Sequence, residues 1–179
     1  DLVFTNGLIT SNIINKYSHY PKNYIRTSSA LRFNIEKINN YKKIRITSIL
    51  VVLEGIPDVI NLIKLIFKFS QITNYKIIIR THPVLRYSSF TKFLNKYDLN
   101  ERIYISETES LDSNFKDSQI CIYWGSAVCL DAILFGIPVL HFNEGKFLSY
   151  DPLFELEYFK WDFNNEKQLI KVINKIELM

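Results

Sequence analysis

Residues 120–142 read ICIYWGSAVCLDAILFGIPVLHF, and this stretch decides the fold class. Its first part, 120–124, is an apolar run that ends at Gly125-Ser126, which predicts a buried strand followed by a tight turn. Residues 127–135 predict a helix, which the following glycine closes. Residues 137–142 form a second apolar run. Apolar strands joined by a helix are typical of a parallel sheet covered on both sides.

The alternation of strand-like runs with helical patterns extends over most of the chain. Further strands are expected at 44–53, 75–79 and 102–105, and further helices at 57–70, 89–97, 110–117 and 166–176. With right-handed crossovers between the strands, this order predicts an α/β fold, a doubly wound parallel sheet of the Rossmann-like kind.

The first forty residues are more irregular than the rest. Strand-like runs at 2–4 and 24–27 flank a helical pattern, so residues 1–40 are interpreted as an interdomain β-α-β segment that contributes a hinge and an edge of the sheet. Residues 41–179 form the expected Rossmann-like domain. Because the chain begins with Asp1 inside a strand-like run, we expect a fragment that lacks an N-terminal domain.

The composition excludes several classes of protein. A chain of 179 residues, 47% of them hydrophobic, can build one packed core and is not a disordered tail. The net charge of +4 is mild, and the basic cluster at 37–45 is interpreted as a solvated linker, so no nucleic-acid partner is expected. The apolar stretches 46–53 and 129–142 are too short or too interrupted to span a bilayer. Cys121 and Cys129 lie in apolar segments, which indicates buried thiols and a cytoplasmic location.

Polar residues and glycines follow the predicted strands, where an open parallel sheet binds its ligands. These positions are Glu54-Gly55, Arg80 with His82-Pro83, Glu107 and Glu109, and Gly125-Ser126. Their shared location predicts a site at the carboxyl ends of the strands.

Gly125-Ser126 lies at a strand-to-helix turn. Free backbone N–H groups, a close approach permitted by glycine and the Ser126 hydroxyl together suit a phosphate. The alternative is that Ser126 is only a helix cap, which is the better explanation for this residue alone. The chain has neither a GxGxxG nor a GxxxxGK[ST] motif, so a dinucleotide site and a P-loop are not expected.

His82-Pro83 follows the strand at 75–79. The proline fixes the turn and the imidazole can bond a phosphate or protonate a leaving group, while Arg80 can pair with a phosphate. The alternative is a turn histidine beside a surface arginine.

Acidic residues provide the other candidates. Glu107 or Glu109 can accept the hydroxyls of a ribose, or can simply favour the start of a helix. Asp131 lies in an apolar helix and needs a partner, either a ligand or the chain itself. Glu54-Gly55 borders the expected crevice or forms a simple turn, and His141 is interpreted as a satisfied histidine at the edge of the core.

Four stretches together resemble the C-terminal domain of GT-B glycosyltransferases. They are IIIRTHP at 77–83, Ser110-Leu111, WGSAVCLDA at 124–132 and FGIPV at 135–139. Their order and spacing are most similar to the branch with a His-Pro motif, which includes bacterial sialyltransferases, capsule Kdo transferases and CDP-glycerol glycerophosphotransferases. Residues 5–33 are similar to the interdomain segment of such enzymes.

The resemblance implies a role for each matching residue. His82 would contact the donor phosphate and assist the leaving nucleotide, and Ser126 with the adjoining backbone of Gly125 and Ala127 would bind that phosphate. Glu109 would hold the ribose. Asp131 stands where many relatives carry Glu, and Ala127 replaces the second hydroxyl residue of some sialyltransferases, which weakens a CMP assignment.

These residues together favour glycosyl transfer from a nucleotide-activated sugar to a surface glycan. The expected partners are a CMP- or CDP-linked donor, with UDP next, and a glycan or lipid-linked acceptor bound by the N-terminal domain, with peripheral membrane contact left open. No metal or other cofactor is expected. Two alternatives remain: a GT-B-fold nucleotide-sugar 2-epimerase, and a non-catalytic Rossmann module of a glycan pathway.

Overall fold

The computed structural model of the chain describes residues 1–29, 45–84, 102–106, 110–145 and 149–179. The chain divides into two compact units, residues 1–37 and 38–179. The expected helix at 89–97 and the residues Glu107 and Glu109 lie outside the described residues.

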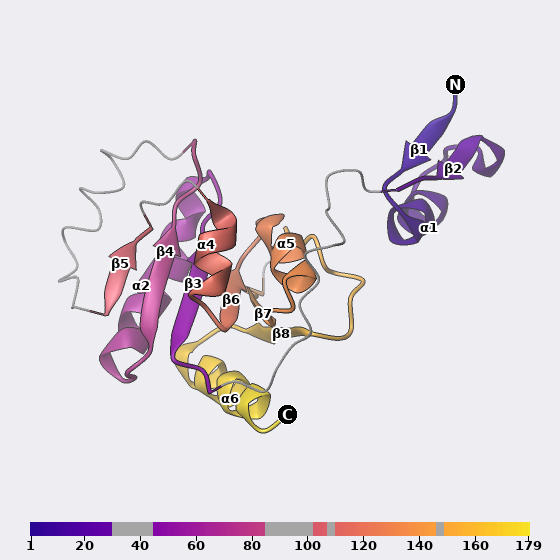
Figure 1. Ribbon diagram of the computed structural model, residues 1–179. Helices are drawn as coiled ribbons and strands as arrows, with labels where there is room; N and C mark the ends of the chain where they lie inside the picture. Colours follow the sequence, from indigo (N-terminus) through magenta and orange to yellow (C-terminus); the bar gives the residue numbers. More distant parts are fainter. Residues whose placement is uncertain (30–44, 85–101, 107–109, 146–148) are drawn as a thin grey trace. The chain divides into compact units, whose positions relative to one another are not determined.

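The larger unit is built on a six-stranded parallel sheet (Figure 1). Its strands are β3 (Ser48–Val52), β4 (Lys76–Arg80), β5 (Ile103–Ile105), β6 (Ile120–Tyr123), β7 (Val139–Phe142) and β8 (Lys160–Phe163). They lie in the order β5-β4-β3-β6-β7-β8, and every neighbouring pair is parallel. The order is that of a doubly wound Rossmann-like sheet, with the chain reversing its direction of travel between β3 and β6. The predicted α/β fold is confirmed.

Helices cover both faces of this sheet (Figure 1). They are η3 (Pro57–Val59), α2 (Ile60–Gln71), α4 (Leu111–Lys116), α5 (Val128–Leu134) and α6 (Glu166–Glu177). Apolar side chains of α2 and α6 share one core cluster, and those of α4 and α5 share the other.

The strands are apolar on both sides because each face meets helices. In β3, Ile49 and Val51 pack in the α2 and α6 cluster, while Leu50 and Val52 pack in the opposite cluster. All four are at most 2% exposed, as parallel strands covered on two faces require.

The two cysteines are buried in the core and carry free thiols, as expected. Burial raises the pKa of Cys129 to about 12. The same cause raises the pKa of Cys121 well above its ordinary value. Both thiols therefore serve as small apolar groups.

The end of α5 follows its sequence signal. Gly136 has a φ of 75°, a left-handed conformation that favours glycine, and its N–H bonds the carbonyl of Ile133 over 2.8 Å. The next N–H, of Ile137, bonds the carbonyl of Ala132 over 2.9 Å. The chain thus turns directly from α5 into β7.

The described residues of the smaller unit, 1–29, form a β-α-β motif. It comprises β1 (Val3–Thr5), α1 (Leu8–Tyr17), η1 (Lys22–Tyr24) and β2 (Ile25–Thr27). β1 and β2 pair in parallel with each other and form a separate two-stranded sheet. The expectation that this segment forms an edge of the main sheet is therefore wrong for the described residues. None of the helices in the described parts of the chain combines the length and the apolar character that a bilayer crossing requires.

Candidate functional site

Glu54 and Gly125 meet at the point where β3 and β6 separate. The register pairs Val51 with Ile122, so Glu54 and Gly125, each three residues further along its strand, reach the same level of the sheet. The Glu54 carboxylate oxygen Oε1 accepts hydrogen bonds from the N–H of Gly125 over 2.6 Å and of Trp124 over 3.3 Å. The switch point of the sheet therefore holds a carboxylate bound to two backbone amides.

His82 lies against Gly55 at the same end of the sheet. A Cβ atom added to Gly55 would lie 2.9 Å from His82 Nδ1, so the absent side chain leaves room for the imidazole. Nδ1 accepts a hydrogen bond from the Val84 N–H over 3.2 Å. A neutral ring with Nδ1 as acceptor carries its proton on Nε2. The exposed imidazole thus offers an N–H donor next to Gly55.

These contacts join the predicted residues into one continuous group. His82 touches Gly55, the neighbouring Glu54 reaches Gly125, and Ser126 follows directly. Pro83 is exposed at the turn after β4. The sequence-predicted residues from three loops therefore lie together at the carboxyl ends of β3, β4 and β6.

Ser126 and Ala127 lie immediately before α5. Ser126 is buried, and its Oγ accepts a long hydrogen bond of 3.4 Å from the Val128 N–H. Ala127 is exposed at the N-cap position. The long bond is weak, so it leaves the hydroxyl able to bond another group.

Gly125 is required by a neighbour that sequence reasoning missed. A Cβ atom at this position would lie 2.8 Å from the Tyr150 Cβ and 3.1 Å from the Tyr150 carbonyl oxygen. The Tyr150 ring also packs edge-on against Trp124, with 5.4 Å between ring centroids. Tyr150 therefore lies against the residue that was expected to leave room for a phosphate.

Arg80 is oriented by a buried asparagine. Its Nη1 donates to Asn114 Oδ1 over 2.8 Å, and the Asn114 amide donates to Ser106 Oγ over 2.8 Å. Asn114 is 4% exposed and ties α4 to the ends of β4 and β5. Nothing in the pattern of the short helix singles out this residue. Asp131 lies half-buried in the first turn of α5.

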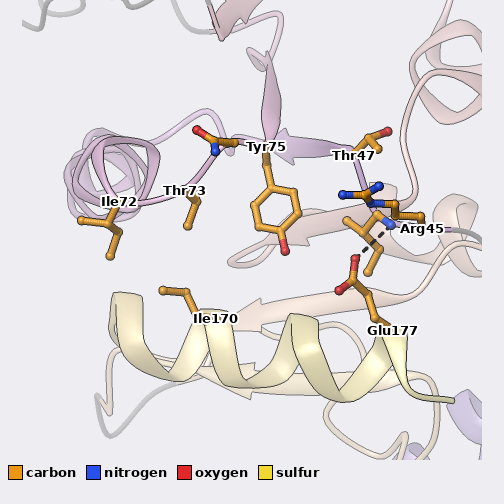
Figure 2. Close-up of a pocket in the computed structure, with 9 residues that line it drawn as sticks. Arg45, Thr47, Ile72, Thr73, Tyr75, Ile170 and Glu177 are labelled. Atoms are coloured by element: carbon orange, nitrogen blue, oxygen red, sulfur yellow. Dashed lines mark hydrogen bonds between the residues drawn. The ribbon is translucent and has the colours of Figure 1, made fainter.

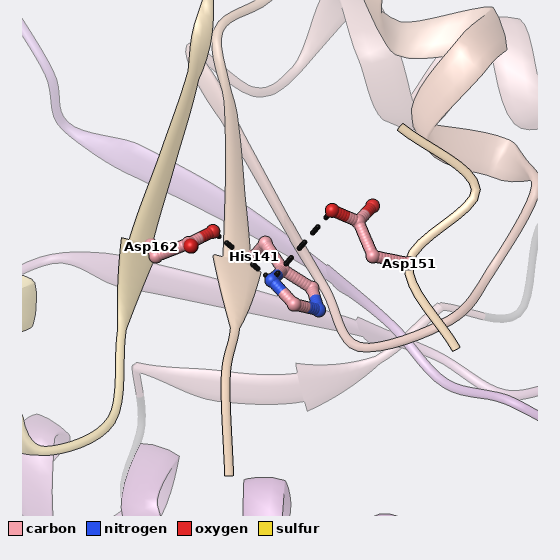
Figure 3. Close-up of side chains that lie close together, drawn as sticks. All are labelled: His141, Asp151 and Asp162. Carbon is pink, nitrogen blue, oxygen red and sulfur yellow. Dashed lines mark hydrogen bonds and ion pairs between the residues drawn. The ribbon is translucent and has the colours of Figure 1, made fainter. Parts of the chain in front are cut away.

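A second polar group lies across β6, β7 and β8. The register places Tyr123, His141 and Asp162 in one row on the same face of the sheet. His141 Nδ1 lies 3.0 Å from Asp162 Oδ1 and 3.8 Å from Asp151 Oδ2, a carboxylate of the following loop (Figure 3). His141 is 4% exposed, which agrees with its interpretation as a satisfied histidine.

Lys160 balances the charge of these carboxylates. Its ammonium lies 2.6 Å from Asp151 Oδ2 and 4.0 Å from Asp162 Oδ1. His141, Asp151 and Asp162 have the spacing of metal ligands, but the lysine already supplies a cation within this group. We interpret the cluster as an ionic network that holds the loop after β7.

The protonation of this network follows from its contacts. Burial alone would raise the pKa of Asp151, but hydrogen bonds from Lys160, the Leu153 N–H and Tyr123 outweigh it and lower the pKa below its ordinary value. Burial, followed by the bond to Asp151, raises the pKa of the Tyr123 hydroxyl. Asp151 is therefore an anion and Tyr123 a neutral donor at neutral pH.

A cavity of about 420 Å³ lies at the other end of the sheet (Figure 2). Thr47 and Tyr75, which immediately precede β3 and β4, line it together with Arg45 and Glu177. Glu177 Oε1 accepts a hydrogen bond from the Ile46 N–H over 3.1 Å. The cavity adjoins the amino ends of the strands and is separate from the residues described above.

Comparison with known proteins gives matches of structure only. No protein-family model and no curated protein matches the sequence. UDP-GlcNAc 2-epimerase from Methanocaldococcus jannaschii, solved with UDP-GlcNAc and UDP, superposes with a TM-score of 0.68 at 16% identity over 99% of this chain and 54% of that chain. HepE from Anabaena, solved with UDP-glucose, gives 0.61 at 12% identity over 97% of this chain and 53% of that one.

A third match has the same character. TarM gives a TM-score of 0.61 at 15% identity over 99% of this chain and 36% of that one. The chain thus spans about half the length, or less, of the structures that it matches. At these identities the likeness establishes the fold, a GT-B-like α/β domain.

Proposed function

We propose that the chain is the donor-binding half of a GT-B-type glycosyltransferase that uses a nucleotide-activated sugar in surface polysaccharide synthesis. The observation that carries the proposal is the convergence of His82, Gly55, Glu54 and Gly125 where β3 and β6 separate. Open parallel sheets bind nucleotides at this point. The UDP-sugar ligands of the matched structures support the same class of ligand.

In this proposal the residues act on the leaving nucleotide. His82 donates its Nε2–H to a phosphate oxygen, and Ser126 with the amides of Gly125 and Ala127 binds the same group. Such donors stabilise the negative charge that develops as the bond to the sugar breaks. Arg80 adds positive potential from the end of β4, while Glu109 and Asp131 are the proposed contacts to the ribose or base.

The acceptor belongs to a second domain in this proposal. The matched epimerase and HepE structures are about twice as long as the chain, and a two-stranded sheet such as β1–β2 is marginal by itself. The unit also exposes large apolar side chains, including Phe4 at 66% and Leu8 at 70%. We propose that an N-terminal domain completes this unit and binds a glycan or lipid-linked acceptor on the cytoplasmic side of the membrane.

Nucleotide-dependent stabilisation tests the proposal. We expect CMP, CDP or UDP to raise the melting temperature of the full chain, since a ligand at 100 times its dissociation constant adds about 2.7 kcal/mol. A preference for cytidine nucleotides would support the resemblance to the branch with the His-Pro motif. A preference for uridine nucleotides would favour a UDP-linked donor, the ligand class of the epimerase and HepE structures. His82→Ala should abolish the shift, while the matched control His19→Ala, at an exposed position of the smaller unit, should keep it. If no nucleotide stabilises the chain, a non-catalytic module becomes the better description.

A 2-epimerase is the second candidate, favoured by the match of 0.68 to an enzyme of that name. It would share the phosphate site but need no acceptor. Incubation of the full-length protein with donor alone separates the two, because release of a new free sugar without acceptor supports epimerisation.

A further inference from the structure

The backbone amides at the switch point already hold an anion that belongs to the chain. The Gly125 N–H and the Trp124 N–H both point to Glu54 Oε1, and the 2.6 Å bond from Gly125 is short for an N–H···O contact. Gly125 is also the glycine that the proposed function assigns to the donor phosphate. A ligand phosphate and the Glu54 carboxylate therefore compete for the Gly125 N–H.

The other oxygen of this carboxylate is poorly satisfied. Oε2 is buried and makes no hydrogen bond to the described residues. A buried charged oxygen without a partner is unfavourable. The free energy lost by burying Oε2 therefore offsets part of the stabilisation from the two bonds to Oε1. An anion whose oxygens are all satisfied can therefore replace the Glu54 carboxylate on these two amides.

A second anion cannot bind beside the carboxylate without repulsion. Two negative charges a few ångströms apart at a partly buried site repel strongly, and an anion on the Gly125 amide would be that close to Oε1. Binding therefore requires Glu54 to leave, and its departure frees two N–H donors at once.

We infer that Glu54 is a displaceable internal anion that occupies the Trp124–Gly125 amide pair and sets the affinity of this site for a diphosphate. The inference rests on the proposed function for the identity of the ligand. Its physical content, competition between a carboxylate and a phosphate for two named amides, can be measured with inorganic pyrophosphate alone.

The test follows the Gly125 amide by NMR in the full chain as pyrophosphate is added. In wild type the amide is held by Glu54, and pyrophosphate should shift it only at high concentration. Glu54→Ala should lower the concentration for the half-maximal shift at least tenfold. Glu54→Gln, which keeps an acceptor and removes the charge, should give a smaller gain. Glu177→Ala is the matched control, because Glu177 also accepts a backbone N–H but lies at the other end of the sheet; it should leave the titration unchanged.

The outcomes are separable from those of the nucleotide panel. Equal or weaker pyrophosphate binding in Glu54→Ala, or a Gly125 amide that does not respond at all, overturns the inference. If Glu54→Ala does not fold, as judged by the dispersion of its amide spectrum, Glu54→Gln decides by the same criterion. If Glu54→Ala binds pyrophosphate more tightly but no nucleotide binds, the result supports Glu54 as the internal anion and counts against a nucleotide-sugar donor. If a nucleotide binds but Glu54→Ala does not bind it more tightly, the result supports the donor and counts against the internal anion.

Discussion

The Tyr123 hydroxyl donates a hydrogen bond of 2.8 Å to Asp151 Oδ1, and this bond joins the end of β6 to the loop between β7 and β8. The same carboxylate accepts the Leu153 N–H over 2.8 Å and the Lys160 ammonium over 2.6 Å. Because Tyr150 directly precedes Asp151 and packs on Gly125, these bonds fix the residue that borders the candidate phosphate site. The polar network is therefore structural in itself and acts on the site through Tyr150.

Tyr123→Phe removes one donor from a buried carboxylate. We expect a loss of about 1–3 kcal/mol in the free energy of unfolding, because hydrogen bonds to charged groups are worth that much when buried. Urea denaturation measures the loss. Tyr158→Phe is the control, since its ring is 74% exposed, and it should change the free energy by less than about 0.5 kcal/mol. Equal effects of the two substitutions would contradict the role given to the Tyr123 hydroxyl.

Lys160→Met leaves the buried charge of Asp151 without its cation. The side chains of Lys160 and Asp151 are only 12% and 2% exposed, so we expect a loss of about 3–5 kcal/mol. Lys68 forms the contrasting pair, 3.9 Å from Glu166 with its own side chain 73% exposed. Lys68→Met should cost at most about 0.5 kcal/mol, because exposed pairs contribute little.

A double-mutant cycle makes the Lys160 prediction specific. Lys160→Met combined with Asp151→Asn should be less destabilised than the sum of the two single variants, because the neutral asparagine no longer needs a cation. Strict additivity would show that the two side chains do not interact.

Acid should weaken the protein through Asp151. Hydrogen bonds from Lys160, the Leu153 N–H and Tyr123 hold its pKa in the folded protein below the ordinary value, so the folded state binds this proton less tightly than the unfolded state. The contribution is fully present above the unfolded pKa and is lost as the pH falls through the folded pKa. Urea denaturation from pH 7 down to about pH 2.5 should show a shallower acid loss in Asp151→Asn than in wild type. Asp58→Asn, at an exposed position, should keep the wild-type slope.

The fold could be predicted from the sequence because its strands are continuous apolar runs. β3, β4, β6 and β7 are buried on both faces, and such runs stand out from the surrounding helices. β8 was missed because its sequence, KWDF, mixes polar and apolar residues, and only pairing with β7 gives it the geometry of a strand. The separate pairing of β1 with β2 was also missed, because sequence alone does not say which strands pair.

For the candidate site, the sequence predicted that its residues meet but not which contacts they make. Residues that follow neighbouring parallel strands must meet at one edge, so the nearness of His82 to Gly55 follows from topology. The bond from Gly125 to Glu54 does not, because the position of a side chain in a crevice depends on three-dimensional packing. Tyr150 and Asn114 left no sequence signal at all, since each acts through contacts that only the fold makes.

The two glycines of the site should respond differently to an added methyl group. In Gly125→Ala the new Cβ would lie 2.8 Å from the Tyr150 Cβ and 3.1 Å from its carbonyl oxygen, so backbone must move. In Gly55→Ala the nearest atom, at 2.9 Å, belongs to the exposed His82 ring, which can turn away, although the Val84 Cβ at 3.3 Å must also give slightly. We expect Gly125→Ala to lower the free energy of unfolding by about 1–3 kcal/mol, the cost of overpacking a crowded position, and Gly55→Ala to cost clearly less. Gly55→Ala should instead shift the NMR resonances of the His82 ring, because the imidazole loses the space it occupies and its bond to the Val84 N–H. A larger loss in Gly55→Ala than in Gly125→Ala would mean that His82, and not Tyr150, is the residue held rigidly at this site.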